Sequence, residues 1–68
     1  MTVSKIVTLK SSSPLSFDEA IKAGVARAHK TLKHVTGAWV KNQEVHVDEG
    51  GRITDYRVEL KVTFILED

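Results

Sequence analysis

The alternation of apolar and polar residues is clearest from Ile53 to Leu66. From Asp55 onward the even positions are apolar and the odd ones mainly polar: Tyr56, Val58, Leu60, Val62, Phe64 and Leu66 against Asp55, Arg57, Glu59, Lys61 and Thr63. A period of two residues is typical of a strand with one buried face. The pattern therefore predicts a strand over 53–66 whose apolar side faces a core.

Two other segments carry a weaker strand pattern. Val3–Leu9 has apolar residues mainly at odd positions, and Ser11–Pro14 after it predicts a loop. Ala38–Val47 predicts a second strand, in which the alternation changes parity. This change indicates a β-bulge near Asn42–Glu44 or partial cover on both faces. Asp48–Gly51 contains two glycines and predicts a hairpin turn into the last strand.

An apolar stripe at helical spacing lies between the first two strands: Phe17, Ile21, Gly24, Val25, Ala28 and Leu32. This stripe predicts a helix from about Phe17 to Lys33. Ser16 and Glu19 have the spacing of a capping box at its start, and Gly24 on the stripe indicates a close approach to a sheet. The element order predicts an α+β fold over residues 1–68. We expect a single β-α-β-β domain with a three-stranded antiparallel sheet packed on one helix.

The chain is short for a protein that completes its core alone. A domain of 68 residues buries only about 60% of the surface that its unfolded chain exposes. Small proteins usually add disulfides, a metal or partner subunits. The strand Ile53–Leu66 spans roughly 46 Å, whereas the helix Phe17–Lys33 spans roughly 25 Å. We therefore expect self-association, with uncovered apolar surface near Val62, Phe64 and Leu66.

The composition narrows the classes of partner and compartment. Hydrophobic residues make up 41% and charged residues 28% of the chain, which is typical of a globular protein. The absence of cysteine excludes disulfides, thiol catalysis and zinc–thiolate sites. A formal net charge of +1 and few aromatic residues argue against a nucleic-acid partner. Because the sequence shows neither an apolar stretch of about 20 residues nor a signal peptide, we expect a cytoplasmic protein with no membrane partner.

Few residues suggest chemistry, and each has an ordinary structural explanation. Trp39 could stack on a planar ligand, although packing in a core or an interface is the more common role. Arg57 could hold a flavin carbonyl, a phosphate or a carboxylate, but an ion pair with Glu44 across the hairpin is favoured. His46 and Asp48 could bind a metal, but without a third strong ligand a solvated turn is preferred. We identify no catalytic and no metal-binding residues.

Three segments, together with the end of the chain, match the pattern of a known family: Ser16–Ile21, Ala26–Leu32 and Asp55–Phe64, followed by Phe64–Asp68. On these segments, its length and its element order, the chain resembles the dodecins. This resemblance implies a β-α-β-β subunit that assembles with copies of itself into a hollow homododecamer. It also implies that the cage binds a small molecule, namely a flavin such as riboflavin or FMN.

The second strand departs from the pattern that the resemblance implies. In flavin-binding dodecins a tryptophan of this strand stacks on the flavin, and a glutamine follows the tyrosine of the last strand. Aligned without a gap, Gly37 takes the position of that tryptophan, Trp39 the position of a nearby glutamate, and Arg57 that of the glutamine. Trp39 points to the same sheet face as Gly37 but lies about 6–7 Å along the strand. Either a local shift returns the indole to the ligand, or the chain represents a branch without flavin.

The resemblance therefore implies a non-enzymatic protein that binds, stores or buffers flavin. Its cofactor-binding residues would be Trp39, Arg57 and Gly37. Trp39 would stack on the flavin and quench its fluorescence, Arg57 would donate hydrogen bonds to the ring or a phosphate, and Gly37 would leave room. The alternative is a dodecin-like structural cage that does not bind flavin and holds ions or another small ligand.

Overall fold

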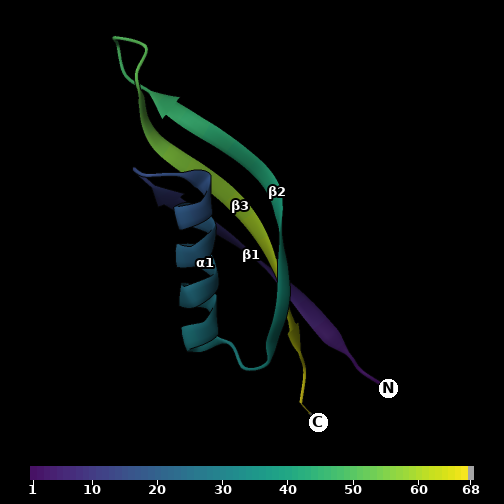
Figure 1. Cartoon of the computed structure of the whole chain (residues 1–68). Coiled ribbons are helices and arrows are strands. Elements are labelled where there is room, and N and C mark those ends of the chain that lie inside the picture. The colour runs from purple at the N-terminus through teal and green to yellow at the C-terminus, as the bar shows by residue number, and fades with distance from the viewer. Residues whose placement is uncertain (68) are drawn as a thin grey trace.

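One helix covers one face of a three-stranded sheet in the computed structural model, which describes residues 1–67 (Figure 1). The elements are β1 (Ser4–Ser13), α1 (Phe17–Thr31), β2 (Val35–Val47) and β3 (Ile53–Ile65). The strands are ordered β1-β3-β2, and both neighbours of β3 run antiparallel to it. The predicted α+β class and β-α-β-β order are therefore confirmed. Asp68, the last residue of the predicted domain, lies outside the described residues.

The start of α1 is fixed by the predicted cap. The Ser16 hydroxyl accepts a hydrogen bond of 3.0 Å from the backbone N–H of Glu19. This bond satisfies one of the N–H groups that a helix start leaves without a partner. The helix ends before the predicted Lys33, because Leu32 is already extended and His34 adopts a φ of 60°. This left-handed residue turns the chain into β2.

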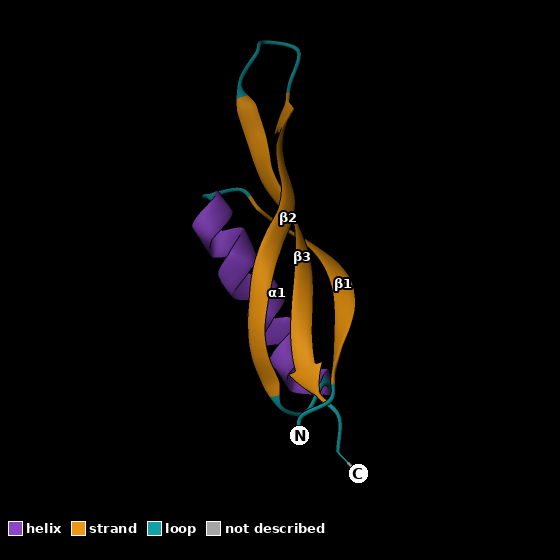
Figure 2. Cartoon of the chain, turned by 90° about the vertical axis from the view of Figure 1, so that its right-hand side faces the viewer, coloured by secondary structure: helices purple, strands orange, loops and turns teal. Residues whose placement is uncertain are grey.

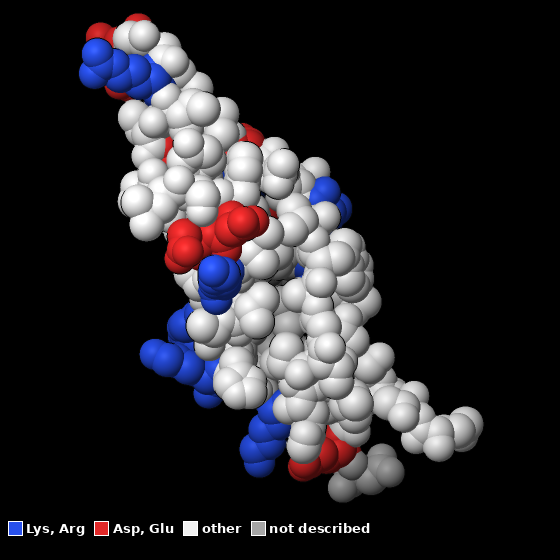
Figure 3. All heavy atoms as spheres, in the orientation of Figure 1, with Lys and Arg blue, Asp and Glu red and all other residues white. Residues whose placement is uncertain are grey.

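The exposed side of α1 carries charges that suit the helix dipole. Asp18 and Glu19 lie in its first turn, and His29 and Lys30 lie in its last. Figure 3 shows acidic side chains over the beginning of the helix and basic ones toward its end. Negative charge near the N-terminus and positive charge near the C-terminus are both favourable. The polar side of the helix therefore faces water, and its apolar side is available for the sheet.

The core is formed between α1 and the middle of β3, and its buried residues are Ala20, Ala28, Val58, Leu60 and Val62. Gly24 lies against this region, as the sequence predicted. A Cβ atom added to Gly24 would lie 2.6 Å from Leu60 Cδ1 and 3.1 Å from Ser11 Cβ. Because such distances are too short for ordinary contact, the absence of a side chain lets the helix lie close to the sheet.

Two strand boundaries differ from the sequence prediction. Ser11–Ser13 was expected in a loop, but these serines continue β1 and pair with Tyr56, Arg57 and Val58 of β3. The prediction was wrong because polar residues join a strand when a long partner offers its hydrogen-bonding groups. β2 begins at Val35, before the predicted Ala38. Its register shifts between Val40 and Asn42, just before the predicted bulge.

The hairpin turn follows the prediction at Asp48–Gly51. The Asp48 carboxylate accepts hydrogen bonds from the backbone N–H groups of Gly50, at 2.8 Å, and Arg52, at 3.0 Å. Gly51 has a φ of 79°, a conformation that glycine adopts without a steric penalty. An acidic side chain and one left-handed glycine therefore close the β2–β3 hairpin.

Uncovered apolar surface lies at both ends of β3, at the predicted end, where Leu66, Val3 and Ile6 are exposed, and also at the hairpin end. Val62 is fully buried and Phe64 is half-buried, whereas Leu66, Val47 and Ile53 are exposed. Val47 and Ile53 are paired near the hairpin turn, which extends beyond α1 in Figures 1 and 2. The prediction for Val62 was wrong because α1 packs over the middle of β3 and leaves the hairpin end bare. Over residues 1–67, no helix combines the length and apolarity required to cross a membrane.

Candidate functional site

The face of the sheet opposite α1 carries the candidate site. Residues that pair across antiparallel strands point to the same side, so the register assigns to this open face four rows that run through all three strands. The rows, from β1 through β3 to β2, are Ser12–Arg57–Glu44, Lys10–Glu59–Asn42, Thr8–Lys61–Trp39 and Ile6–Thr63–Gly37. All three predicted site residues therefore belong to one face, and charged side chains of β3 separate them.

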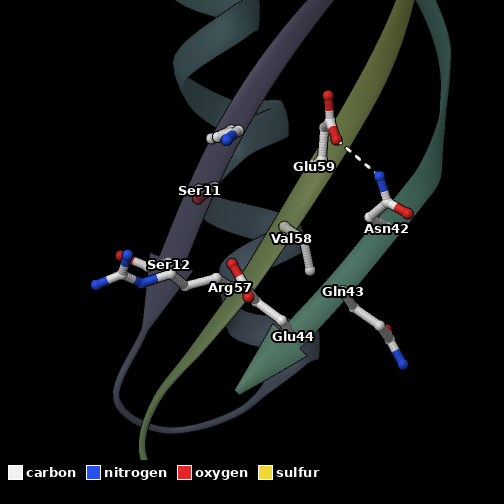
Figure 4. Close-up of a pocket in the computed structure, with 9 residues that line it drawn as sticks. Ser11, Ser12, Asn42, Gln43, Glu44, Arg57, Val58 and Glu59 are labelled. Carbon is white, nitrogen blue, oxygen red and sulfur yellow. Dashed lines mark hydrogen bonds between the residues drawn. The ribbon is translucent and has the colours of Figure 1, made fainter. Parts of the chain in front are cut away.

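A trough of about 510 Å³ crosses this face, and it is lined by Lys10, Ser11, Ser12, Asn42, Gln43, Glu44, Arg57, Val58 and Glu59. Figure 4 shows these residues coming from all three strands, with β3 along the floor. The register shift of β2 lies at one end of the trough. Since a bulge bends and twists the strand that carries it, the irregularity of β2 helps to hollow the face. The volume is within the range of small-molecule sites.

Arg57 contributes to the trough but does not form the expected ion pair. Its Nε donates to Asp55 Oδ2 at 3.0 Å along the same strand. Glu44 lies opposite Arg57 in the register, as predicted, but Figure 4 shows its carboxylate reaching from β2 toward β3 while Arg57 extends toward Ser12. The pairing prediction was wrong because Asp55, two residues away on the same face, offers a nearer carboxylate. The terminal nitrogens of Arg57 remain available as donors on this face.

Glu59 forms the best-defined polar contact of the trough. Asn42 Nδ2 donates a hydrogen bond of 2.8 Å to Glu59 Oε1. This bond, with smaller contributions from the positive charges of Lys41, Lys10 and Lys61, holds the pKa of Glu59 below its ordinary value of 4.5 against the opposing effect of desolvation. Glu59 is therefore a carboxylate at neutral pH, and its charge balances neighbouring ammonium groups.

Trp39 and Gly37 lie outside the trough, toward the other end of the open face. The Trp39 side chain is 49% exposed and lies in the row of Lys61, whose Nζ donates to Thr8 Oγ1 at 2.7 Å. A Cβ atom added to Gly37 would meet nothing within 4 Å. The indole therefore stands beside open space, in the row next to the trough, and Arg57 is the only predicted site residue that lines the trough itself.

Sequence reasoning missed several polar residues of this face, namely Lys10, Asn42, Glu59 and Lys61. The alternation of β3 already placed Glu59 and Lys61 on its polar side. Their partners on β1 and β2 depend on the strand register, which the alternation within one strand does not reveal. His46 and Asp48 were the residues considered for a metal site. The Asp48 carboxylate accepts hydrogen bonds from backbone N–H groups of the turn, and the backbone carbonyl of His46 accepts one from the Thr54 hydroxyl. Within residues 1–67 no group of three or more His, Asp or Glu side chains is arranged to hold a metal ion.

Comparisons with known proteins agree with this architecture. Residues 3–67 match the family described as Dodecin. The chain is 36% identical to calcium dodecin of Mycobacterium tuberculosis, over 94% of this chain and 89% of that protein. It is 39% identical to the dodecin of Thermus thermophilus, over 97% of this chain and 94% of that protein.

Solved structures show the same fold. A crystal structure of Thermus thermophilus dodecin with an arginine-to-alanine substitution has a TM-score of 0.91 and 38% identity, and the match covers 100% of both chains. The crystal structure of the calcium-chelating calcium dodecin of Mycobacterium tuberculosis, which describes a calcium-binding site, has a TM-score of 0.82 and 32% identity. That match covers 96% of this chain and 91% of the other. The backbone fold is thus shared with relatives, one of which is named for calcium.

Proposed function

The chain belongs to the dodecin family, and on this premise we propose that it is a non-enzymatic protein that binds, stores or buffers flavin. The ligand, riboflavin or FMN, would lie on the open face of the sheet. One observation carries the proposal: a half-exposed Trp39 shares this face with Arg57 and stands beside the open space at Gly37. An indole next to free volume is a ready stacking surface for a planar ring.

The residues present fit such a ligand. A flavin would supply a planar redox-active ring whose edge both donates and accepts hydrogen bonds. Trp39 would stack against it, Gly37 would leave room for it, and Arg57 would donate to its carbonyl groups or to a phosphate. The trough beside them, about 510 Å³ in volume, provides further donors and acceptors. The residues would hold and orient the ring, so no chemical step is assigned to the protein.

We also propose that the binding unit is a homo-oligomer, a dodecamer by family resemblance. Within residues 1–67 the core contains five buried apolar residues, and the strands at both sheet edges, β1 and β2, are available for contacts. Exposed Val47 and Ile53 add apolar surface that another subunit would cover. Native mass spectrometry should give about twelve times the 7.6 kDa mass of one chain. A stably folded species of 7.6 kDa at micromolar concentration would contradict this assembly.

Fluorescence titration tests the flavin proposal. Adding the protein to riboflavin or FMN should quench flavin emission, because stacking on an indole brings the two ring systems into contact. Trp39→Leu should abolish the quenching, whereas Trp39→Phe should keep binding with weaker quenching. Undiminished flavin emission at high micromolar concentrations of folded protein would reject the flavin role.

A second candidate function is a cage that holds ions or another small ligand and does not use flavin. Two observations favour it: Trp39 lies outside the trough, and Arg57 is already engaged by Asp55. A relative with 36% identity is named calcium dodecin. Calorimetric titration with calcium separates the candidates, because heat of binding for calcium together with unquenched flavin would select the cage.

A further inference from the structure

The charges of the chain are distributed unevenly along it. Between Glu19 and Glu44 the sequence contains five basic residues and no aspartate or glutamate, whereas residues 44–68 contain seven acidic residues and three basic ones. The net charge of +1, which argues against a nucleic-acid partner, is therefore an average over two unlike parts. A local excess of one sign matters for association, because a surface charge is felt over about one Debye length, roughly 10 Å at 0.1 M salt.

Much of this positive charge lies on the outer side of α1. Arg27 and Lys30 belong to the second half of the helix, and Lys33 lies just beyond its end at Thr31. All three side chains are exposed, and Figure 3 shows basic side chains over this half of the helix. Residues three apart in a helix are about 4.5 Å apart along its axis. We call Arg27, Lys30 and Lys33 the basic helix face.

The charges of the basic helix face are not balanced by carboxylates within residues 1–67. Lys22 pairs with Glu19 at 3.7 Å, and Glu67 contacts His34, whereas Arg27, Lys30 and Lys33 form no ion pair in this part of the chain. The negative end of a helix dipole is equivalent to about half an elementary charge. Three full positive charges exceed what the dipole requires, and a surface that serves solubility alone normally mixes both signs.

The basic helix face stays accessible in the proposed homo-oligomer. Lysine is depleted in protein–protein interfaces. The exposed apolar residues Val47 and Ile53, which another copy would cover, lie at the hairpin end. This end extends beyond α1 in Figures 1 and 2. The uncharged exposed residues of the helix include only small ones such as Ala23 and Ala26. Each copy would therefore present its basic helix face to the solvent.

The side chains around these charges indicate the class of partner. Proteins that bind single-stranded nucleic acid stack its bases on aromatic side chains, and helices that lie on membranes insert large apolar residues. From Lys22 to Thr31 the exposed residues of α1 are alanine, threonine, histidine and basic residues, which suit neither mode. Contact by charge alone fits duplex DNA, which carries one negative charge per about 1.7 Å of its axis and whose bases are paired and stacked.

We propose that the basic helix face binds the phosphate backbone of duplex DNA without regard to base sequence. The guanidinium of Arg27 and the ammonium groups of Lys30 and Lys33 would donate charge-assisted hydrogen bonds to phosphate oxygens. One face with three charges binds weakly, and several faces of one oligomer would engage the same duplex and increase the affinity. This surface is separate from the trough and does not depend on flavin binding.

Fluorescence anisotropy with a labelled duplex of about 30 base pairs tests the proposal on the folded oligomer. Two duplexes of unrelated sequence should bind with equal affinity at low salt. The logarithm of the association constant should fall with the logarithm of the salt concentration with a slope of about −3 or steeper, because each neutralised phosphate contributes about −0.9. The double variant Arg27→Gln, Lys30→Gln should bind about tenfold more weakly or worse, with a shallower slope.

Matched variants separate this surface from the total charge. Lys41→Gln, Arg52→Gln also removes two charges, both outside α1, and should change the affinity by less than about threefold. Lys33→Gln, beyond the end of the helix, should weaken binding even if the double variant alters α1, whose circular dichroism is measured in parallel.

Three results would overturn the proposal. The first is that the parent protein does not bind the duplex at about 50 mM salt, where non-specific binding through phosphates is strong. The second is an equal loss of affinity in the two double variants, because the total charge rather than the basic helix face would then determine binding. The third is binding to vesicles of phosphatidylglycerol without binding to the duplex, which would assign the basic helix face to a membrane surface instead.

Discussion

The two faces of β3 share one backbone but differ in burial and in charge. Val58, Leu60 and Val62 point to α1 and are at most 2% exposed, while Glu59 and Lys61 between them point to the open face. Because successive residues of a strand alternate in direction, the stability of the core and the proposed binding depend on different side chains of the same strand. The open face can therefore carry different polar residues without disturbing the core.

The largest expected difference between the faces comes from truncation at adjacent positions of β3. Leu60→Ala should lower the free energy of unfolding by about 2–5 kcal/mol, because Leu60 is fully buried and its loss leaves a cavity. Lys61→Met on the open face should change it by less than about 0.5 kcal/mol. Urea denaturation at one fixed protein concentration measures both, since assembly makes stability depend on concentration. Similar values for the two variants would contradict the division between the faces.

Alanine substitutions of two glycines provide a second comparison between the core side and the open face. Gly24→Ala should destabilise the protein by about 1–2 kcal/mol, because the added methyl group would lie 2.6 Å from Leu60 Cδ1 and the cost of overpacking exceeds the helix preference of alanine. Gly37→Ala should be neutral or slightly stabilising, because its methyl group meets open space. Thermal denaturation compares them, and a greater loss for Gly37→Ala would show that the open face is packed in the assembly.

A smaller effect is expected from two serine hydroxyls. Ser16→Ala should cost about 1 kcal/mol, because Ser16 accepts the capping hydrogen bond from Glu19. Ser12→Ala in the trough should cost less than about 0.5 kcal/mol. Circular dichroism during urea denaturation checks both, and equal losses would indicate that Ser12 has a structural role equal to that of the cap.

The smallest expected effect is a pH dependence of stability on the open face. Because the pKa of Glu59 is lowered in the folded chain, its contribution is fully present above the unfolded value and is lost as the pH falls below 4.5 through the folded value. Glu59→Gln should remove this part of the acid sensitivity. In Asn42→Ala, an NMR titration should find the pKa of Glu59 moved back toward 4.5, because the largest lowering contribution is gone. An unchanged pKa would show that the lysines dominate.

The features predicted correctly from the sequence depend on residues near one another in the chain. The Ser16 cap, the Asp48–Gly51 turn and the alternation of β3 arise from spacings of two to four residues, and Gly24 is recognised from its place on a helical stripe. The loop at Ser11–Ser13 was predicted wrongly for the same reason, since the local composition of three serines gives no information about the strand opposite them.

The candidate site was only partly accessible to the same reasoning. Trp39, Gly37 and Arg57 were singled out, and Trp39 was assigned to the face of Gly37, but the position of Arg57 relative to them, its partner Asp55 and the trough were not predicted. The contacts that build the site join Asn42 to Glu59 across 17 positions and Lys61 to Thr8 across 53. Such pairs depend on strand register, and a bulge in β2 shifts that register.

The sequence by itself thus determined the order of the elements, their buried sides, and the cap and turn that bound them, because these follow from steric and hydrogen-bonding preferences of neighbouring residues. Only the tertiary structure decided which charges meet on the open face, that serines extend β1, and that the apolar surface of the hairpin end lies bare. Those outcomes depend on where three strands and one short helix align, and alignment is set by packing over the whole chain rather than by any local pattern.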